Sequence, residues 1–387
     1  MPTPSAPTPE TSGGRAAPTA PAERIVALDV IRGVALLGIL VMNALSFGLD
    51  PAGYYNVSAA GIGHPVDWVV GVASMIFFDQ KMMALFSMLF GVGVVIFAER
   101  AAAKGRRVVG LSLWRFALLG LVGLVHISFW DGDVLLLYAL CAPVVVLVRG
   151  LSVRVLASLG VALALTGAIV APLFEAAAGG RPDDLQGFWF VGYDGFSSTA
   201  EGWFLVNAAS RALGFMFLGV ALYRTGIVQG RRDDAYYRRL ARWGLGIGIA
   251  VTSAGMAWRV VGDWSADAAI SGTIPTGLGT IPMALGYLAV IILWSRSGSR
   301  PVERVGRVGQ MALTNYLTQT IIGLVTFSWI LVDVEITRTM IAVWILGVWA
   351  LQLWWSPRWL AHFRYGPFEW AWRCATYRSW QPLRRDR

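Results

Sequence analysis

Long uncharged stretches constrain this chain more than any other feature. One of them begins after Arg32 and runs about fifteen residues without a charge, long enough with its flanks to cross a bilayer as a helix. Such stretches recur, so that 56% of the 387 residues are hydrophobic and only 14% are charged. Soluble domains carry about 25% charged residues, and this chain therefore lacks the polar surface that it would need in water. We predict an all-α, polytopic integral membrane helix bundle whose partner is the lipid bilayer.

The apolar stretches predict about ten transmembrane helices. No polar stretch between them is long enough to fold by itself, so we expect one membrane domain rather than an anchor with a soluble enzyme attached. The predicted spans lie near residues 30–48, 76–97, 112–128, 134–149, 153–174, 203–223, 242–262, 276–295, 311–331 and 338–355.

The loops between these spans alternate in charge. The basic set contains Arg100, Lys104, Arg106, Arg107, Arg149, Arg154, Arg224, Arg231, Arg232, Arg238, Arg239, Arg242, Arg296, Arg300, Arg304 and Arg307. The opposite set contains Asp50, Asp67, Asp131, Asp133, Glu175, Asp183, Asp184, Asp194, Glu201, Asp263, Asp267, Asp333 and Glu335, with Arg181 and Arg338 as its exceptions. Because basic loops remain in the cytoplasm, the alternation predicts an even number of spans with both termini cytoplasmic. The same loops explain the net charge of +9, so we expect no nucleic-acid partner.

We expect three parts along the chain. Residues 1–23 are rich in Pro, Ala and Thr and predict a disordered cytoplasmic tail. Residues 24–355 form the membrane-embedded domain. In residues 356–387, Trp and Tyr alternate with Arg, which favours a helix at the cytoplasmic interface that restarts at Pro367.

Polar residues inside membrane spans are costly and are therefore candidates for function. His126 lies near the outer end of its span, and Asp131 and Asp133 follow it in a tight turn. A histidine beside a carboxylate can act as a general base with an orienting partner, although a packing role explains a lone membrane histidine equally well. Arg115 precedes His126 by eleven residues and lies on the same helix face, about 16 Å away along the axis.

The first span carries a carboxylate and a guanidinium where it enters the membrane. Asp29 and Arg32 are three residues apart and share a helix face, so they form either an orienting ion pair or a cytoplasmic vestibule in which Arg32 meets a phosphate. Near the far end of this span, Asn43 is a lone amide.

Two further pairs have two interpretations each. Asp79 and Lys81 interrupt an apolar run and predict a broken helix, in which they are either a snorkelling pair or part of a gate. Asn315 and Gln319 lie four apart on one face, where interhelical hydrogen bonding explains them as well as a substrate site does.

Several smaller patterns also give expectations. Two prolines in GTIPTGLGTIP, which begins at residue 272, favour a kinked or partly unwound start of the eighth span. Gly244 and Gly248 fit close helix packing, and Glu369 is placed to pair with Arg373. Three scattered histidines and two cysteines predict no metal site.

The chain resembles the YeiB-like bacterial membrane proteins, the domain-of-unknown-function 418 family, over nearly all of its length. The matching segments are LDVIRGVALLGILVMN (28–43), ALFSMLFGVG (84–93), GLVHISFWDGDVLLLYAL (123–140), VGRVGQMALTNYLTQT (305–320) and YGPFEWAWR (365–373). This resemblance implies a multi-pass protein of the bacterial cytoplasmic membrane.

The first of these segments also resembles the opening helix of acyltransferase-3 proteins and of the lysosomal heparan-glucosaminide acetyltransferase. Both groups move acyl groups from cytoplasmic acyl-CoA to a sugar across the membrane. In acyltransferase-3 proteins a functional histidine follows the arginine by eleven residues, and Asn43 stands at that place here. The departure leaves His126, or less strongly His64, as the candidate base.

Two hypotheses follow. In the first, the protein is an acyltransferase in which Arg32 and Arg115 hold acyl-CoA and His126, oriented by Asp131 or Asp133, activates a glycan or small-molecule acceptor at the outer face. In the second, the protein transports a small solute along a polar track lined by Asp79, Lys81, Asn315 and Gln319.

Overall fold

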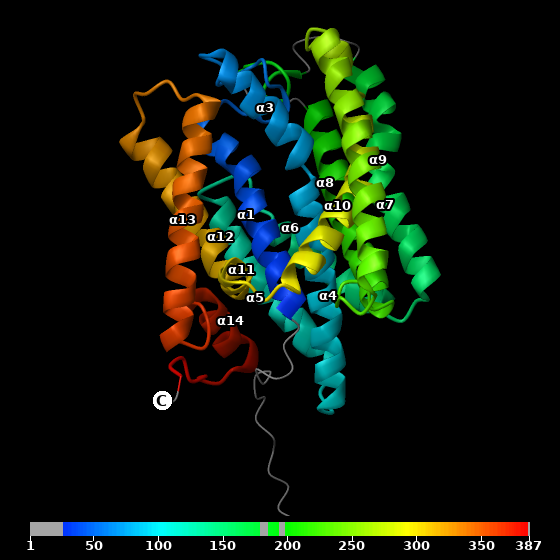
Figure 1. Cartoon of the computed structure of the whole chain (residues 1–387), viewed down its shortest axis with the longest axis vertical. Coiled ribbons are helices and arrows are strands. Elements are labelled where there is room, and N and C mark those ends of the chain that lie inside the picture. Colours follow the sequence, from blue (N-terminus) through cyan, green and yellow to red (C-terminus); the bar gives the residue numbers. More distant parts are fainter. Residues whose placement is uncertain (1–25, 179–184, 193–197, 386–387) are drawn as a thin grey trace, which may run out of the picture.

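The structure of this protein is a computed structural model that describes residues 26–178, 185–192 and 198–385. In these residues it contains helices and two isolated β-bridges but no strand, which confirms the all-α fold (Figure 1). The tail predicted for residues 1–23 lies outside the described residues. The helices are α1 (Val26–Gly48), α2 (Ala52–Tyr55), α3 (Pro65–Phe77), α4 (Lys81–Ala103), α5 (Val108–Ile127), α6 (Leu135–Val148), α7 (Val153–Ala178), α8 (Ser198–Arg224), α9 (Asp234–Val261), η3 (Ala266–Ala268), α10 (Thr273–Ser295), α11 (Arg300–Gln310), α12 (Ala312–Leu324), η4 (Val325–Ile330), α13 (Arg338–His362) and α14 (Pro367–Tyr377).

Among the described residues, eight helical segments are long and apolar enough to cross a membrane, which identifies a multi-pass membrane protein. Two of the predicted spans are shorter. Helix α6 has 14 residues, and a helix of that size is about 21 Å long, less than the ~30 Å hydrocarbon core. The ninth predicted span is divided into α12, with 13 residues, and the π-helix η4, with 6.

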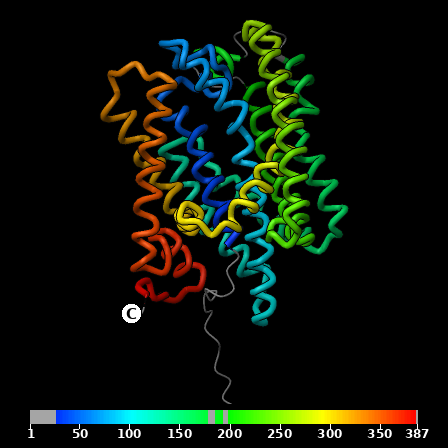
Figure 2. Tube along the Cα trace, in the orientation of Figure 1, coloured from blue at the N-terminus to red at the C-terminus, as the bar shows by residue number. Residues whose placement is uncertain are grey.

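Helix α1 lies at the centre of the bundle, between the α12–α13 side and the α7–α9 side (Figure 2). In the most apolar part of α1 and of the segment that contains α10, 61% of the residues are buried. The corresponding share is 22% in α5 and 28% in α7 and α13. The outer helices expose large apolar side chains, as expected of surfaces that contact lipid. These include Leu121 and Leu124 on α5, Ile169 and Leu173 on α7, and Val343 and Leu346 on α13.

The loops of like charge meet at opposite ends of the bundle. At the end that carries the C-terminus, Arg224 donates to the carbonyl of Leu151 and Arg296 donates to that of Gly230 (Figure 1). At the other end, Asn56 donates to the carbonyl of Trp189. The predicted grouping of loops is therefore present in space, and the assignment of the basic end to the cytoplasm stays a prediction.

Arg338, the exception within the acidic set, is a buried structural residue. Its guanidinium is 1% exposed and donates to the carbonyls of Gly53, Asn56 and Val57. It therefore ties the start of α13 to the loop around α2 instead of adding charge to the surface.

The predicted break before the second span is confirmed. Helix α3 ends at Phe77 and α4 begins at Lys81, and Gln80 between them has a left-handed backbone with φ 64°. The sequence predicts a kinked or partly unwound start of the eighth span. The unwound alternative is wrong, because α10 is helical from Thr273 and continues through Pro282, and the kink stays a prediction. The boundary predicted at residue 355 falls inside α13, which continues to His362.

The C-terminal segment contains α14, and its packing corrects the expected Glu369–Arg373 pair. The Glu369 carboxylate accepts hydrogen bonds from the N–H groups of Leu313 and Thr314 and from the Thr314 hydroxyl. The first N–H groups of a helix lack partners inside it and favour a carboxylate, so Glu369 completes the start of α12. The Arg373 guanidinium instead lies 4.5 Å from the Tyr365 ring centroid.

Candidate functional site

A hydrogen-bonded chain of three side chains is centred on His126. Its Nδ1 lies 2.8 Å from Oδ1 of Asp133, and its Nε2 lies 3.0 Å from the hydroxyl of Thr320 on α12. His126 is 7% exposed, and the side chain of Asp133 is fully buried. Because the carboxylate can only accept, it fixes the tautomer with a proton on Nδ1, and Nε2 then presents its lone pair to the hydroxyl.

The sequence positions His126 and Asp133 through a tight connection between α5 and α6. Oδ2 of Asp133 accepts the Leu136 N–H in the first turn of α6, at 2.8 Å. Helix α5 comes so close to α6 here that a Cβ at Gly123 would collide with the Leu136 backbone. Both oxygens of the carboxylate are therefore held in place by one hairpin.

Two aromatic rings enclose the imidazole. The ring centroids of Trp130 and Tyr316 lie 5.5 Å and 5.3 Å from that of His126. The Trp130 indole donates to the Ser46 hydroxyl at 3.0 Å, which links the site to the C-terminal end of α1. This apolar environment lowers the local dielectric and strengthens the electrostatic interaction of His126 with Asp133.

The structure brings only part of the predicted set to His126. Asp133 contacts it, whereas the Asp131 side chain is exposed. Helix α1 contributes Ser46 to the site. The backbone carbonyl of Asn43 accepts a hydrogen bond from the Ser46 hydroxyl, and the Asn43 side chain does not contact His126 through a hydrogen bond among the described residues. His64 caps the start of α3, where its Nδ1 accepts the Val66 N–H.

The two arginines predicted to hold acyl-CoA differ in availability. Arg32 pairs with Asp29 at 3.0 Å and keeps 29% of its side chain exposed. Arg115 is enclosed by rings, with its guanidinium 4.5 Å from the Phe97 centroid and 3.9 Å from that of Trp372. Of the two, Arg32 is more accessible to a ligand that approaches the end of the bundle at which the C-terminus lies.

Asn315 and Gln319 are engaged in hydrogen bonds between helices. The Asn315 amide donates to the Val308 carbonyl and the Ser356 hydroxyl, and Gln319 donates to Gln352 on α13 at 3.0 Å. These contacts match the interhelical alternative of the two interpretations.

Asp79 and Lys81 lie at the break between α3 and α4. The ammonium of Lys81 is fully buried and donates to the Met75 carbonyl, and Asp79 accepts from Gln80. Neither residue shares a hydrogen bond with Asn315 or Gln319 among the described residues, so these contacts do not connect the four into the polar track that solute transport would need.

Comparison with known proteins places the chain in a family. Residues 222–379 match the family described as "Protein of unknown function (DUF418)". Over 388 aligned residues, the chain is 33% identical to "Uncharacterized protein YeiB" of Escherichia coli (strain K12), an alignment that covers 93% of this chain and 98% of that protein. The chain belongs to the DUF418 family.

Other relatives align over similar lengths. This DUF418 protein is 30% identical to "Uncharacterized protein YxaH" of Bacillus subtilis (strain 168), over 95% of this chain and 97% of that one. It is 26% identical to the "Uncharacterized 39.9 kDa protein in amylase 3'region" of Bacillus acidopullulyticus, with the same coverage of both chains. No solved structure matches the chain.

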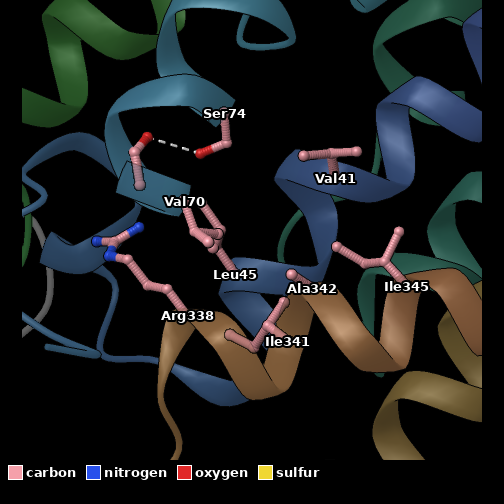
Figure 3. Close-up of a pocket in the computed structure, with 9 residues that line it drawn as sticks. Val41, Leu45, Val70, Ser74, Arg338, Ile341, Ala342 and Ile345 are labelled. Carbon is pink, nitrogen blue, oxygen red and sulfur yellow. Dashed lines mark hydrogen bonds between the residues drawn. The ribbon is translucent and has the colours of Figure 1, made fainter. Parts of the chain in front are cut away.

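A small cavity in this DUF418 protein lies away from His126, between α1, α3 and α13 (Figure 3). Its volume is about 40 Å³, enough for a few water molecules. Its walls are mainly apolar and include Val41, Leu45 and Ile345, and the Ser74 hydroxyl beside it already donates to the Gly71 carbonyl. The cavity is therefore too small and too apolar for an acyl-CoA site.

Sequence reasoning overlooked Thr320, Tyr316 and Trp130. Thr320 and Tyr316 lie in the segment MALTNYLTQT, where no spacing relates them to His126. In the described part of the chain, no three His, Cys, Asp or Glu residues cluster closely enough to hold a metal ion. The arrangement at His126 offers proton transfer through a buried imidazole.

Proposed function

We propose that this DUF418 protein is an acyltransferase of the bacterial cytoplasmic membrane. It moves an acyl group from cytoplasmic acyl-CoA to a hydroxyl or amine of a glycan or small-molecule acceptor at the outer face. The observation that carries the proposal is the chain from Asp133 through His126 to the Thr320 hydroxyl. The resemblance of residues 28–43 to the first helix of known membrane acyltransferases supports the choice of reaction.

In the proposed reaction, His126 is the general base. The acceptor oxygen or nitrogen attacks the thioester carbonyl carbon while its proton passes to Nε2 of His126. The carbon–sulfur bond then breaks, and the imidazolium returns the proton to the departing thiolate of CoA. Asp133 stabilises the imidazolium between these two steps.

The position of the Thr320 hydroxyl indicates where the hydroxyl or amine of the acceptor would bind. It lies 3.0 Å from Nε2, which is the distance that proton transfer from an acceptor hydroxyl requires. The acceptor either displaces this hydroxyl or passes its proton through it. Arg32 would hold a CoA phosphate at the predicted cytoplasmic end of α1.

The test is turnover of labelled acetyl-CoA by the purified full-length protein in nanodiscs, with release of free CoA as the readout. Wild type is expected to bind and slowly hydrolyse the thioester, and H126Q is expected to lose about 100-fold or more of that rate. H362Q is the matched control, because His362 lies at the end of α13 and is exposed. Absence of acetyl-CoA binding and hydrolysis, with wild type and H126Q identical, would refute the proposal.

A further inference from the structure

Three cations are buried together on the side of α4, α8 and α9, outside the His126 site. Lys81 is 0% exposed, Arg211 6% and Arg259 5%. Each of them interacts electrostatically with the same carboxylate, that of Asp79 at the α3–α4 break. The four side chains therefore form one charged cluster, which we call the Asp79 cluster.

The cations of this cluster have few partners. Lys81 donates to one carbonyl, and Arg211 reaches the Thr280 hydroxyl only at 3.4 Å. The Arg259 guanidinium lies 5.4 Å from the Trp189 ring centroid, and its buried Nε has no hydrogen-bond partner among the residues that the structure describes. Buried donors in folded proteins are almost always paired, so the free Nε indicates that a further acceptor belongs here.

The charges of the cluster do not balance. Three cations face one carboxylate, which leaves two positive charges uncompensated. Among the described residues, none of the three cations forms an ion pair within 4.0 Å. An unpaired buried cation is strongly unfavourable within a membrane protein, and a ligand with two negative charges would remove that cost.

We propose that Lys81, Arg211 and Arg259 bind a phosphate group. A phosphate monoester carries close to two negative charges at neutral pH and three strong acceptor oxygens, which matches the excess charge and the free Nε of Arg259. Two guanidinium forks and one ammonium are the groups that proteins use for this ligand. Lys81 begins α4 and Arg259 is close to the end of α9, so the site lies toward the face opposite the C-terminus.

The site is independent of the proposed acyl transfer. The His126 site is built from α5, α6 and α12, whereas the phosphate site uses α4, α8 and α9. The phosphate belongs either to a soluble compound or to a phospholipid headgroup, and the two sources separate in the test.

The test measures thermal unfolding of the full-length protein in nanodiscs. In one arm, inorganic phosphate is added to phosphatidylcholine nanodiscs, against potassium chloride at the same ionic strength. In the other, phosphatidate replaces part of the phosphatidylcholine. We expect the melting temperature to rise in at least one arm: a rise with inorganic phosphate indicates a soluble ligand, and a rise with phosphatidate alone indicates a lipid.

Variants assign the effect to the cluster. R211Q and R259Q are expected to weaken the response about tenfold or more, measured as the phosphate or phosphatidate concentration at half effect. R238Q is the matched control on α9, because the Arg238 side chain is 62% exposed. R259K keeps the charge without the fork and is expected to retain part of the response.

The unliganded variants separate binding from folding. Removing a surplus buried cation should leave the melting temperature without phosphate unchanged or raise it. The proposal is overturned if wild type responds in neither arm, if R211Q and R259Q respond as wild type does, or if both variants melt lower without phosphate.

Discussion

At the scale of single residues, Asp133 has two tasks that depend on each other. One carboxylate oxygen accepts the Leu136 N–H, and the other faces Nδ1 of His126. Because the Leu136 N–H needs an acceptor, the first turn of α6 sets the orientation of the Asp133 side chain. The second carboxylate oxygen is then directed at the imidazole. The residue thereby connects the start of a helix to the tautomer of the candidate base.

This arrangement makes D133N informative. The Leu136 N–H would hold the amide oxygen, so the amide nitrogen would face Nδ1 of His126 and drive the proton to Nε2. We expect nitrogen-15 NMR of labelled histidine to report the change of tautomer, and acetyl-CoA turnover to fall by about 100-fold or more. D131N, two residues away on an exposed side chain, should alter neither. An unchanged tautomer in D133N would show that Asp133 does not orient the ring.

Glu369 gives a prediction on pH. Burial raises the pKa of Glu369 above its usual 4.5, against the opposing effect of the hydrogen bonds from Thr314 and Leu313. The folded protein therefore binds this proton more tightly than the unfolded chain does. The resulting stability is complete below about pH 4.5 and is lost as pH rises through the raised pKa.

The variant E369Q mimics the protonated side chain at every pH. Its melting temperature relative to wild type should therefore increase between about pH 4.5 and pH 8. E303Q is the control, because the Glu303 side chain is 67% exposed. A difference that stays flat with pH would mean that Glu369 does not change protonation on folding.

Residue-scale prediction from the sequence succeeded where partners are close along the chain. His126 and Asp133 are seven residues apart in one hairpin, so spacing alone brings them together. Thr320 is 194 residues from His126, and only the tertiary fold brings α12 within hydrogen-bonding distance of the end of α5. Sequence spacing pairs Glu369 with Arg373 on the same helix. Its actual partner, the start of α12, is more than fifty residues away in the sequence and cannot be inferred from spacing.

At the scale of elements, the contact between α9 and α10 depends on glycine. A Cβ at Gly248 would lie 2.5 Å from Cβ of Met283, and one at Gly244 would lie 2.6 Å from the Pro282 carbonyl oxygen. Gly246, on the same helix, has nothing within 4 Å of that position. The pattern seen in the sequence at Gly244 and Gly248 thus corresponds to a close helix crossing.

These glycines form a matched pair for mutation. G248A should destabilise the protein by about 1–3 kcal/mol, because the added methyl group forces two backbones apart. G246A should be neutral or slightly stabilising, since alanine is the better helix former. Unfolding in mixed micelles of a mild detergent and sodium dodecyl sulfate measures both. Equal effects of the two substitutions would show that α9 and α10 are not in close contact at Gly248.

Elements were predictable where polarity changes sharply and obscure where it does not. Asp79, Gln80 and Lys81 interrupt an apolar run, and the chain breaks there. Nothing comparable marks the change from α12 to the π-helix at Val325, since both segments are apolar. For the same reason hydrophobicity alone did not reveal that α6 is too short to cross a bilayer by itself.

At the scale of the whole molecule, the basic loops lie at one end of the helix bundle and the acidic loops at the other, as the charge pattern of the sequence predicts. Basic loops that are far apart in sequence are joined by hydrogen bonds at the end with the C-terminus, and two acidic loops are joined at the other. Arg338 is an exception to the charge alternation in the sequence, but it is buried, and burial cannot be read from the sequence. The loop charges predict that the basic face is cytoplasmic.

Cysteine labelling in intact cells tests that orientation. In a background without Cys141 and Cys374, K104C and S297C lie in exposed basic loops, and D131C and D333C lie in exposed acidic ones. Positively charged loops resist translocation, so an impermeant maleimide added outside should label D131C and D333C only, and K104C and S297C should react after the membrane is opened. If instead K104C and D131C react from the same side, the bundle cannot be threaded as proposed. In that case His126 could not be placed near the outer face, and Arg32 could not be placed at the cytoplasmic end where acyl-CoA would bind.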